Sequence, residues 1–304
     1  MMPNPNKVAI LLLTCDKYLK AAELTLSLLR YHWKEPPEIF VCGLSKDLPG
    51  ESVIPFSVDS RDWMGIALQA TSYLQSCGYE YCYLVLDDHP PVGACNGDYL
   101  KNDLPDLARR LNATVVSMVG WDQIRAYQGT KLDGDQDYWL RNDIAYRWIF
   151  NLHPGCWNIA ALMDILNIVM SSEVSDHSAR TFEASAGSLA THIPEKYKRS
   201  SYRVCGDMFV VDTKWFSRPL VRKGILQALH VVRLLAKTLG GENLLSKSDS
   251  QAKLYTNYLN GPYPMFWSGF MQKGKVHENA VRFLRMANLQ EFAKSASKLK
   301  VNLS

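Results

Sequence analysis

Two adjacent carboxylates end an apolar stretch in the first third of the chain. Tyr83–Leu86 reads "YLVL", and Asp87, Asp88 and His89 follow it, just before two prolines. Neighbouring carboxylates repel each other unless a cation or a proton relieves them. A hard divalent ion takes oxygen ligands and pairs with phosphate oxygens, and an imidazole ligand favours Mn²⁺. The motif therefore predicts Mn²⁺ or Mg²⁺ on Asp88 and His89 beside a phosphorylated ligand. A plain Asp-Asp-His-Pro-Pro turn is the alternative.

Strand and helix patterns alternate up to residue 120 and place these acids at the edge of a sheet. Apolar runs predict buried strands at 8–13, 38–43, 53–58, 81–86 and 114–119, with amphipathic helices between most of them. Asp59 or Ser60 is expected to cap the helix that begins near Trp63. Ligands of open α/β sheets collect outside the carboxyl ends of the strands. Thr14 and Asp16, directly after the first strand, are therefore candidate ligand contacts.

The second half of the chain changes character, and its C-terminal part is strongly basic. A polar, aromatic loop at 129–143, a helix over 159–169, a polar linker at 171–179 and a strand pair within 202–216 are expected, followed by basic helices at 219–239 and 279–299. From Arg218 onward the chain has 14 Lys+Arg against 4 Asp+Glu. This excess predicts either a peripheral contact with an anionic membrane or packing on the acidic body. The chain contains no recognisable nucleic-acid-binding module, so a nucleic-acid partner is not expected.

Composition and missing motifs narrow the class of protein. The chain has 304 residues, of which 47% are apolar, and a formal charge of +4, which is typical of a large folded core. There is no signal-peptide pattern or membrane-length apolar stretch, and seven scattered cysteines form no CxxC pair, so a cytoplasmic location is expected. The absence of GxGxxG and GxxxxGK[ST] argues against dinucleotide oxidoreductases and P-loop enzymes.

Five segments, taken in order, resemble the small bacterial glycosyltransferases of the GT-A fold, which act in surface polysaccharide or lipopolysaccharide assembly. They are "VAILLLTCDKYLKAAELTLSLLRYHW", "SRDWMGIALQATSYLQSCGYEYCYLVLDDH", "YRWIFNLHPGCWNIAALMDIL", "ARTFEAS" and "YRVCGDMFVVDTKWF". The resemblance implies a mixed, mostly parallel sheet flanked by helices. It also implies a catalytic domain at 1–217, with a nucleotide-sugar half at 1–120 and an acceptor half at 121–217, and a helical C-terminal extension at 218–304.

The resemblance also assigns roles to single residues. It places Asp88 on the metal and Asp87 near the ribose or the donor sugar. Thr14 and Asp16 would meet the base and ribose of a nucleoside-diphosphate sugar. Independently of the resemblance, the guanidinium of Arg61, at the start of the helix before the metal strand, would fork to a phosphate, and Lys214 would meet the diphosphate. The alternatives are a helix cap for Asp16, a surface side chain for Arg61 and simple packing for Lys214.

The acceptor half supplies the candidate base. Glu183 follows Phe182 in a segment that partial burial would suit for proton transfer, and a single base implies inversion of configuration. Asp122 is a second candidate acid, and His153 and Trp157 are expected to line an acceptor pocket. The predicted reaction moves a sugar to a glycan or lipid-linked glycan. A non-catalytic sugar-nucleotide or glycan-binding protein on the same fold is the alternative.

Overall fold

The computed structural model describes most of the first two thirds of the chain and part of the C-terminal region. The described residues are 7–118, 129–131, 139–142, 148–188, 192–204, 258–259, 262–266, 270–272 and 274–301. Asp122, Lys214, the helix expected at 219–239 and most of the strand pair expected at 202–216 lie outside these ranges.

The described elements follow the alternation that the sequence predicts. The strands of the main sheet are β1 (Val8–Leu13), β2 (Ile39–Cys42), β3 (Ser52–Ile54), β4 (Tyr81–Leu86), β5 (Val115–Ser117), β6 (Gly129–Lys131), β7 (Trp139–Asn142), β8 (Gly155–Asn158) and β9 (Ser201–Val204). The helices up to residue 204 are α1 (Leu19–His32), α2 (Trp63–Ser76), α3 (Leu104–Arg110), α4 (Ile159–Met170), α5 (Ala179–Ala186) and α6 (Glu195–Arg199), with the short helical turns η1 (Asp16–Tyr18) and η2 (Tyr99–Asp103).

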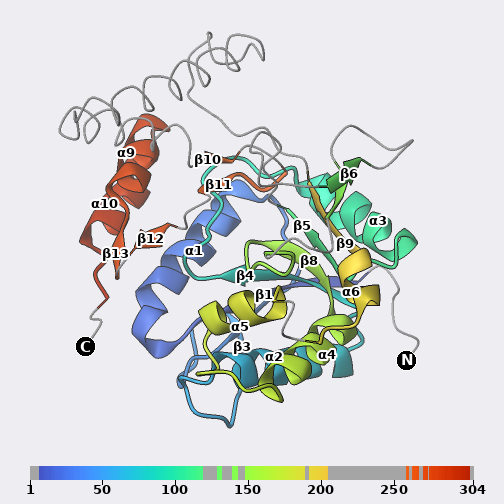
Figure 1. The fold of residues 1–304 in the computed structure, drawn as a ribbon. Coiled ribbons are helices and arrows are strands. Elements are labelled where there is room, and N and C mark those ends of the chain that lie inside the picture. Colours follow the sequence, from blue (N-terminus) through green and yellow to red (C-terminus); the bar gives the residue numbers. More distant parts are fainter. Residues whose placement is uncertain are drawn as a thin grey trace, which may run out of the picture.

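One mixed sheet organises the molecule (Figure 1). Its described strands stand in the order β3-β2-β1-β4-β8-β5-β9-β7-β6. Strands β1 to β4 pair in parallel, β8 enters antiparallel between β4 and β5, and β9 returns to the direction of β5. The fold is therefore α/β, with a mixed, mostly parallel sheet flanked by helices, as predicted.

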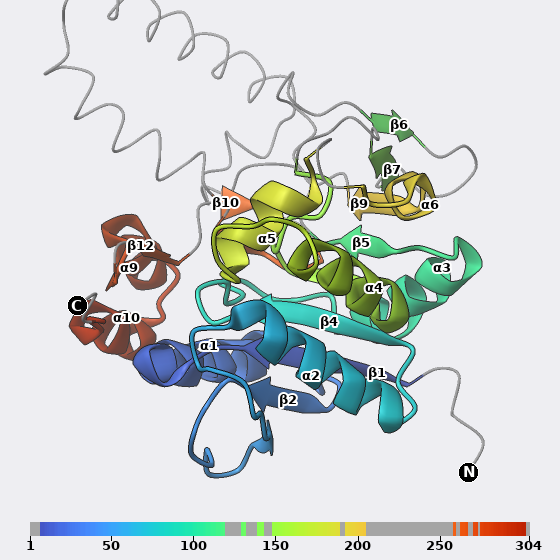
Figure 2. The same ribbon diagram turned by 60° about the horizontal axis from the view of Figure 1, so that its bottom comes forward.

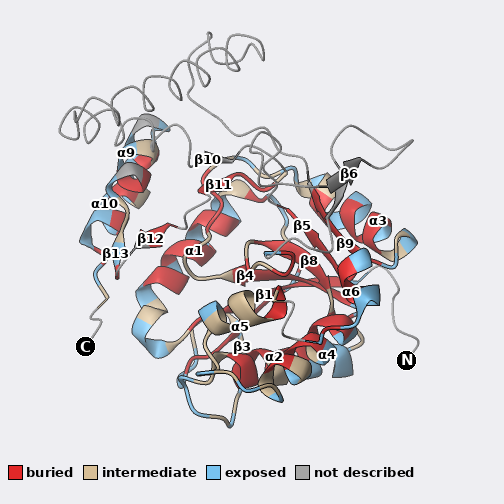
Figure 3. Ribbon diagram, in the orientation of Figure 1, coloured by how far each residue is buried: buried red, intermediate tan, exposed pale blue. Residues whose placement is uncertain are grey.

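Helices cover both faces of the sheet because alternate residues of its strands point to opposite sides. On one face Val8, Ile10 and Leu12 of β1 belong to a core that includes residues of α1 and α3. On the other face Ala9, Leu11 and Leu13 join a core with α2, α4 and α5, and Figure 2 shows α2 and α4 across this face. All six residues of β1 are buried, as Figure 3 shows in red. Burial on both faces explains the unbroken apolar run of β1.

Helices α2 and α4, on the second face of the sheet, each begin with a side-chain cap. Asp62, rather than Asp59 or Ser60, caps α2 by accepting a hydrogen bond from the Gly65 amide at 2.8 Å. The expected cap was thus wrong by two or three residues. Asp59 instead accepts from Arg61. Asn158 caps α4 in the same manner as Asp62 caps α2.

The C-terminal region folds back over the outer side of α1. Its described elements are the strand pairs β10 (Tyr258–Leu259) with β11 (Met265–Phe266) and β12 (Met271–Gln272) with β13 (Lys275–Val276), and the helices α9 (Glu278–Met286) and α10 (Gln290–Lys298). Leu284 of α9 and Ala293 of α10 share a core with Leu24 and Leu28 of α1. Figure 1 shows α9 and α10 beside α1, in red and blue.

One helix was expected over 279–299, and this prediction was wrong. Asn288 has a left-handed φ of 59°, and the Leu289 amide bonds back to the Leu284 carbonyl at 2.8 Å. Asparagine tolerates this conformation better than most residues, and it is a common way to end a helix. The apolar spacing continues across the break because α9 and α10 share one apolar core.

No helix among the described residues has both the length and the apolar content needed to cross a membrane. The described residues include six of the seven cysteines, all of them free thiols. The division into 1–217 and 218–304 stays a prediction.

Candidate functional site

The carboxyl ends of β1 and β4 meet at one edge of the sheet and bring the predicted acids to Thr14. The two strands pair in parallel with Leu13 opposite Leu86, so the residues that follow each strand become neighbours. The Thr14 hydroxyl donates a hydrogen bond to Asp87 Oδ2 at 2.6 Å. The sequence therefore predicted correctly that Thr14 and Asp87 share an edge.

A glycine makes room for this edge. Gly43, directly after β2, has a φ of +102°, and a Cβ there would lie 1.9 Å from the Thr14 carbonyl oxygen. Only glycine permits such a close backbone approach in this conformation. Asp16, the other candidate on this turn, is exposed, and its carboxylate accepts a hydrogen bond from the Ser45 amide at 2.9 Å. Asp16 thus ties the turn after β1 to the loop after β2.

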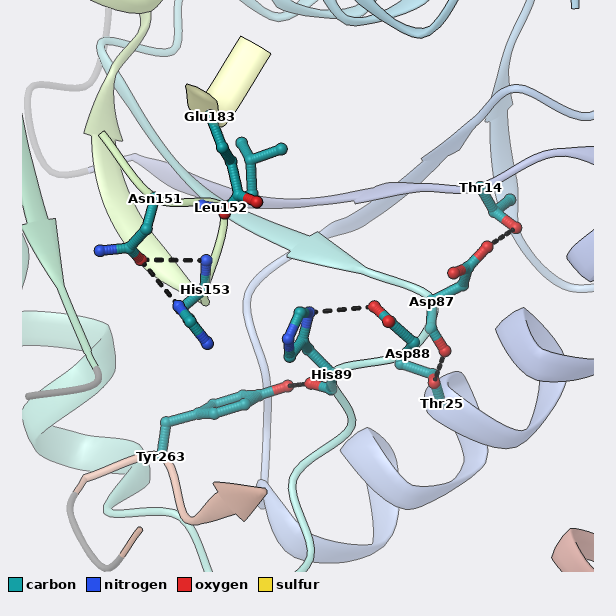
Figure 4. Close-up of polar contacts among 10 residues, drawn as sticks. All are labelled: Thr14, Thr25, Asp87, Asp88, His89, Asn151, Leu152, His153, Glu183 and Tyr263. Carbon is teal, nitrogen blue, oxygen red and sulfur yellow. Dashed lines mark hydrogen bonds and ion pairs between the residues drawn. The ribbon is translucent and has the colours of Figure 1, made fainter. Parts of the chain in front are cut away.

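We call Asp87, Asp88 and His89 the acidic turn. Its backbone is held from two directions. Thr25 of α1, fully buried, donates its hydroxyl to the Asp87 carbonyl at 2.6 Å. From the C-terminal region, the Phe270 amide donates to the Asp88 carbonyl at 2.5 Å, and the Tyr263 hydroxyl donates to the His89 carbonyl at 2.9 Å. Figure 4 shows Thr25 and Tyr263 reaching the turn from different elements.

An imidazole lies beside the second carboxylate. Nδ1 of His89 lies 3.0 Å from Asp88 Oδ1, with the His89 side chain 11% exposed and that of Asp88 33% exposed. Burial alone would disfavour charge on both groups. Their mutual attraction outweighs it, so the pKa of Asp88 is lowered and that of His89 is raised. The charged form of each group therefore favours the charged form of the other.

The first carboxylate behaves differently. Burial, followed by repulsion from Asp88, raises the pKa of Asp87 to about 7, although the Thr14 hydrogen bond works in the opposite direction. Two adjacent carboxylates therefore share the site by different means: Asp88 takes a cationic neighbour, and Asp87 retains a proton over much of the acidic range. The apolar strand β4 can therefore end on two adjacent acids.

Glu183 joins the same cluster from α5, in the second half of the chain. It lies on α5, whose Ser178 caps the helix through the Thr181 amide at 3.2 Å. Its Oε1 accepts a hydrogen bond from the Leu152 amide at 2.6 Å. Burial raises the pKa of Glu183, with His89 opposing and Asp88 reinforcing that shift. A half-buried carboxyl with a raised pKa is suited to accept a proton.

His153 connects Glu183 to the acidic turn. The rings of His153 and His89 are 5.1 Å apart between centroids, and the Asn151 carboxamide oxygen lies 3.0 Å from His153 Nδ1. Figure 4 shows the two imidazoles side by side, with Asp88 next to His89 and Glu183 bonded to the residue before His153. Thr25 and Tyr263 escaped the sequence prediction because each acts on the turn across a long chain separation. Asn151 escaped it although it lies only two residues from His153.

Two candidates lie away from this cluster. The Arg61 side chain is 90% exposed and pairs with Asp59 at 3.1 Å, in agreement with the surface alternative. Trp157 is fully buried in the core shared with α4, so its expected place in an acceptor pocket was wrong. The reason is that β8 is an interior strand, with β4 on one side and β5 on the other.

The acidic turn offers few protein ligands to a divalent ion. Among the residues that the structure describes, no group of three or more His, Cys, Asp or Glu side chains could enclose a metal. Asp87 is engaged by Thr14, whereas Asp88 retains a partly exposed carboxylate. One available carboxylate, with His89 beside it, fits an ion whose remaining ligands are phosphate oxygens and water.

Comparisons with known proteins give little further information. No protein-family model matches the chain, and no curated protein sequence matches it. The solved structure of 4-diphosphocytidyl-2C-methyl-D-erythritol synthase from Anaerococcus prevotii is similar over 59% of this chain and 83% of that chain, at 12% identity and a TM-score of 0.35. That likeness is coarse, and the fold class rests on the strand order and directions given above.

Proposed function

We propose that the chain is a glycosyltransferase that moves a sugar from a nucleoside-diphosphate sugar to a hydroxyl of a glycan or lipid-linked glycan. The observation that carries the proposal is the meeting of the acidic turn, from the first half of the chain, with Glu183, from the second half, around His89 and His153. Group transfer to a hydroxyl needs a place for a charged leaving group and a base near the acceptor, and this arrangement offers both.

The donor side would use the edge formed by β1 and β4. Thr14 and Asp87, joined at 2.6 Å, offer oxygen partners for ribose hydroxyl groups, and Asp16 lies on the same turn. Asp88 would hold Mn²⁺ or Mg²⁺ together with the diphosphate, and such an ion neutralises the charge that develops on the leaving group. His89, the other predicted metal ligand, lies 3.0 Å from Asp88 and would bind the ion through a neutral imidazole. Lys214, which the sequence assigns to the diphosphate, lies outside the described residues.

The acceptor side would use Glu183 as the base. The carboxylate accepts a hydrogen bond from the Leu152 amide, and burial raises its pKa. It would take the proton of the acceptor hydroxyl as that oxygen attacks the anomeric carbon. The bond to the diphosphate oxygen then breaks, and the configuration is inverted. A surface polysaccharide or lipopolysaccharide precursor would be the acceptor, and a cytoplasmic location would suit the free thiols of the described cysteines.

A thermal-shift screen tests the donor half of the proposal. Melting temperatures would be measured with UDP, GDP and CMP, each with and without Mn²⁺. We expect one nucleotide with Mn²⁺ to raise the melting temperature, and Asp88→Asn to abolish that rise. Asp98→Asn, an exposed acid ahead of η2, is the matched control and should keep it. No shift with any nucleotide would overturn the proposal.

A transfer assay tests the acceptor half. Once the donor is known, Glu183→Gln should retain the nucleotide-dependent thermal shift but lose sugar transfer by about 10²-fold or more. Glu173→Gln, an exposed glutamate on the linker before α5, is the control and should transfer normally. Donor binding without hydrolysis or transfer in the unaltered protein would identify a sugar-nucleotide-binding protein instead.

A further inference from the structure

A second candidate site lies in the C-terminal region. A pocket of about 300 Å³ opens between β13, α9 and the end of α10. Among the described residues, its lining includes four cationic side chains, from Lys275, Arg282, Arg285 and Lys300, and one carboxylate, from Glu278. None of these residues belongs to the acidic turn or to its partners.

The backbone forces two of these cations together. Lys275 and Lys300 are opposite each other in an antiparallel bridge, and the Val301 amide bonds to the Gly274 carbonyl at 2.7 Å beside it. Side chains of directly opposed residues start about 5 Å apart on the same face, and like charges there are destabilising. A lysine pair in this register therefore gains stability from an anion between the two ammonium groups.

Helix α9 supplies the other two cations. Arg282 and Arg285 are three residues apart on α9, so their side chains share one face. Both arginines are exposed, whereas Val281 and Leu284, on the adjoining side of α9, are buried in the core with α10 and α1. The apolar packing thus fixes the direction in which the arginines point.

The charges of the pocket are unbalanced. Arg282 donates to Glu278 at 2.7 Å, whereas Lys275, Arg285 and Lys300 have no carboxylate partner among the described residues. Four cations and one carboxylate give a net charge of +3 on a small concave surface. Arginine forks match phosphate oxygens in pairs, and lysines add point charges.

We propose that this basic pocket, formed by Lys275, Arg282, Arg285 and Lys300, binds an anion that carries phosphate groups, with inorganic pyrophosphate as its simplest soluble form. The two lysines clamp the anion from the bridge, and Arg285 binds it from α9. The pocket volume suits a group of this size. The proposal stands apart from the glycosyltransferase activity, because the pocket has its own residues and its own cations.

Site-resolved lysine labelling tests the proposal on the full chain. An amine-acetylating reagent would be applied with and without pyrophosphate, and labelling at each lysine read by mass spectrometry. We expect protection of Lys275 and Lys300, while Lys294 and Lys298, exposed on α10 and outside the pocket lining, label as before. Equal protection of all four lysines would mean general charge screening and would overturn the proposal.

A parallel arm identifies the source of the phosphate. Vesicles of phosphatidylcholine with phosphatidylglycerol would replace pyrophosphate, with pure phosphatidylcholine vesicles as the control. Protection by pyrophosphate supports a soluble anion. Protection of Lys275 and Lys300 by the anionic vesicles alone supports a lipid headgroup. If neither protects these two lysines, the pocket binds no phosphate group and the proposal fails.

A variant separates binding from local folding. Arg285→Gln should weaken the concentration dependence of protection at Lys275 and Lys300 by about tenfold, since it removes a charged hydrogen-bond donor. Lys298→Gln carries the same charge change and should not alter it. Unchanged protection in Arg285→Gln would contradict the proposed site. Arg285 is exposed, so both variants should keep the melting temperature of the unaltered chain.

Discussion

The acidic turn and the basic pocket both place like charges side by side, but the molecule treats them in opposite ways. In the acidic turn, Asp88 pairs with His89 and the pKa of Asp87 rises to about 7, so the protein itself relieves the repulsion. In the basic pocket, Lys275 and Lys300 remain exposed and are left to water and salt. Burial therefore decides whether repulsion is relieved within the fold or left to a mobile ion.

The largest expected effect tests whether the two regions depend on each other. Leu284 is fully buried where α9 meets α10 and α1. Leu284→Ala should lower the free energy of unfolding by about 3 kcal/mol, through lost burial and the cavity it leaves, as measured by urea denaturation. Hydrogen exchange should show lost protection over 278–298, with β1 and β4 unaffected.

The control for this variant lies one residue further along α9. Arg285→Ala changes an exposed side chain and should leave the free energy of unfolding unchanged. If Leu284→Ala also exposes the amides of β4, the acidic turn and the C-terminal helices unfold as one unit, and the comparison between them loses its basis.

A smaller effect is expected from the hydroxyl that holds the acidic turn. Thr25→Val keeps the shape of a buried side chain but removes the donor to the Asp87 carbonyl. The loss should be about 1–2 kcal/mol of unfolding free energy, because a carbonyl at this edge loses its partner. Thr71→Val is the matched control: Thr71 is equally buried, but its hydroxyl bonds to carbonyls of its own helix, α2. Equal losses in the two variants would show that Thr25 has no special role.

Two titratable groups, Asp87 and His32, should contribute to the pH dependence of stability in opposite directions. The pKa of Asp87 is raised from 3.8 to about 7, so the folded chain binds the proton more tightly and stability falls as pH rises through that window. Burial lowers the pKa of His32 from 6.5 to about 4, so the unfolded chain binds the proton more tightly and stability rises with pH through that window. The two contributions oppose each other over much of the same range.

Substitution should make the opposition visible. In buffer with a metal chelator, unfolding free energies between pH 4 and 7 (the window set by these two groups) should rise with pH more steeply in Asp87→Asn than in the unaltered chain. In His32→Gln the unfolding free energies should rise with pH less steeply than in the unaltered chain. Parallel profiles in all three proteins would mean that neither group titrates as its burial implies.

The smallest effect belongs to the basic pocket. Removing both bridge lysines, by Lys275→Gln with Lys300→Gln, should raise the melting temperature at low salt by under about 2 °C, and the gain should vanish at high salt. Lys294→Gln with Lys298→Gln removes the same charge from α10 outside the pocket and should give no such gain. A loss of stability in the first double variant would indicate that these lysines are already neutralised within the chain.

The sequence was most informative where burial is two-sided. The apolar runs of β1 and β4 predicted both strands and the edge on which Thr14 and Asp87 meet, since only interior strands are apolar without alternation. The position of β8 was not predictable from its four residues, because an antiparallel strand inserted between β4 and β5 leaves no local signal. Because β8 is an interior strand, Trp157 lies in the core and does not line a pocket.

The candidate site was predictable only in part. Asp88, His89 and Glu183 stood out as titratable residues in apolar surroundings, and the structure brings them together. Thr25 and Tyr263 act through one hydrogen bond each, 62 and 174 residues away from their partners along the chain. No periodicity or motif encodes contacts of that kind. Arg61 is exposed and pairs with Asp59, two residues away, so the structure does not bring it to this cluster.

The hydrogen bond from the Phe270 amide to the Asp88 carbonyl has a consequence for synthesis on the ribosome. Asp88 follows directly on β4, but the donor that fixes its carbonyl, the Phe270 amide, is translated much later. A nascent chain can therefore form β1 and β4 long before the Phe270 amide is available to hold the backbone of its acidic turn. A chain terminated before Tyr263 would lack the hydrogen bonds that Tyr263 and Phe270 donate to the acidic turn.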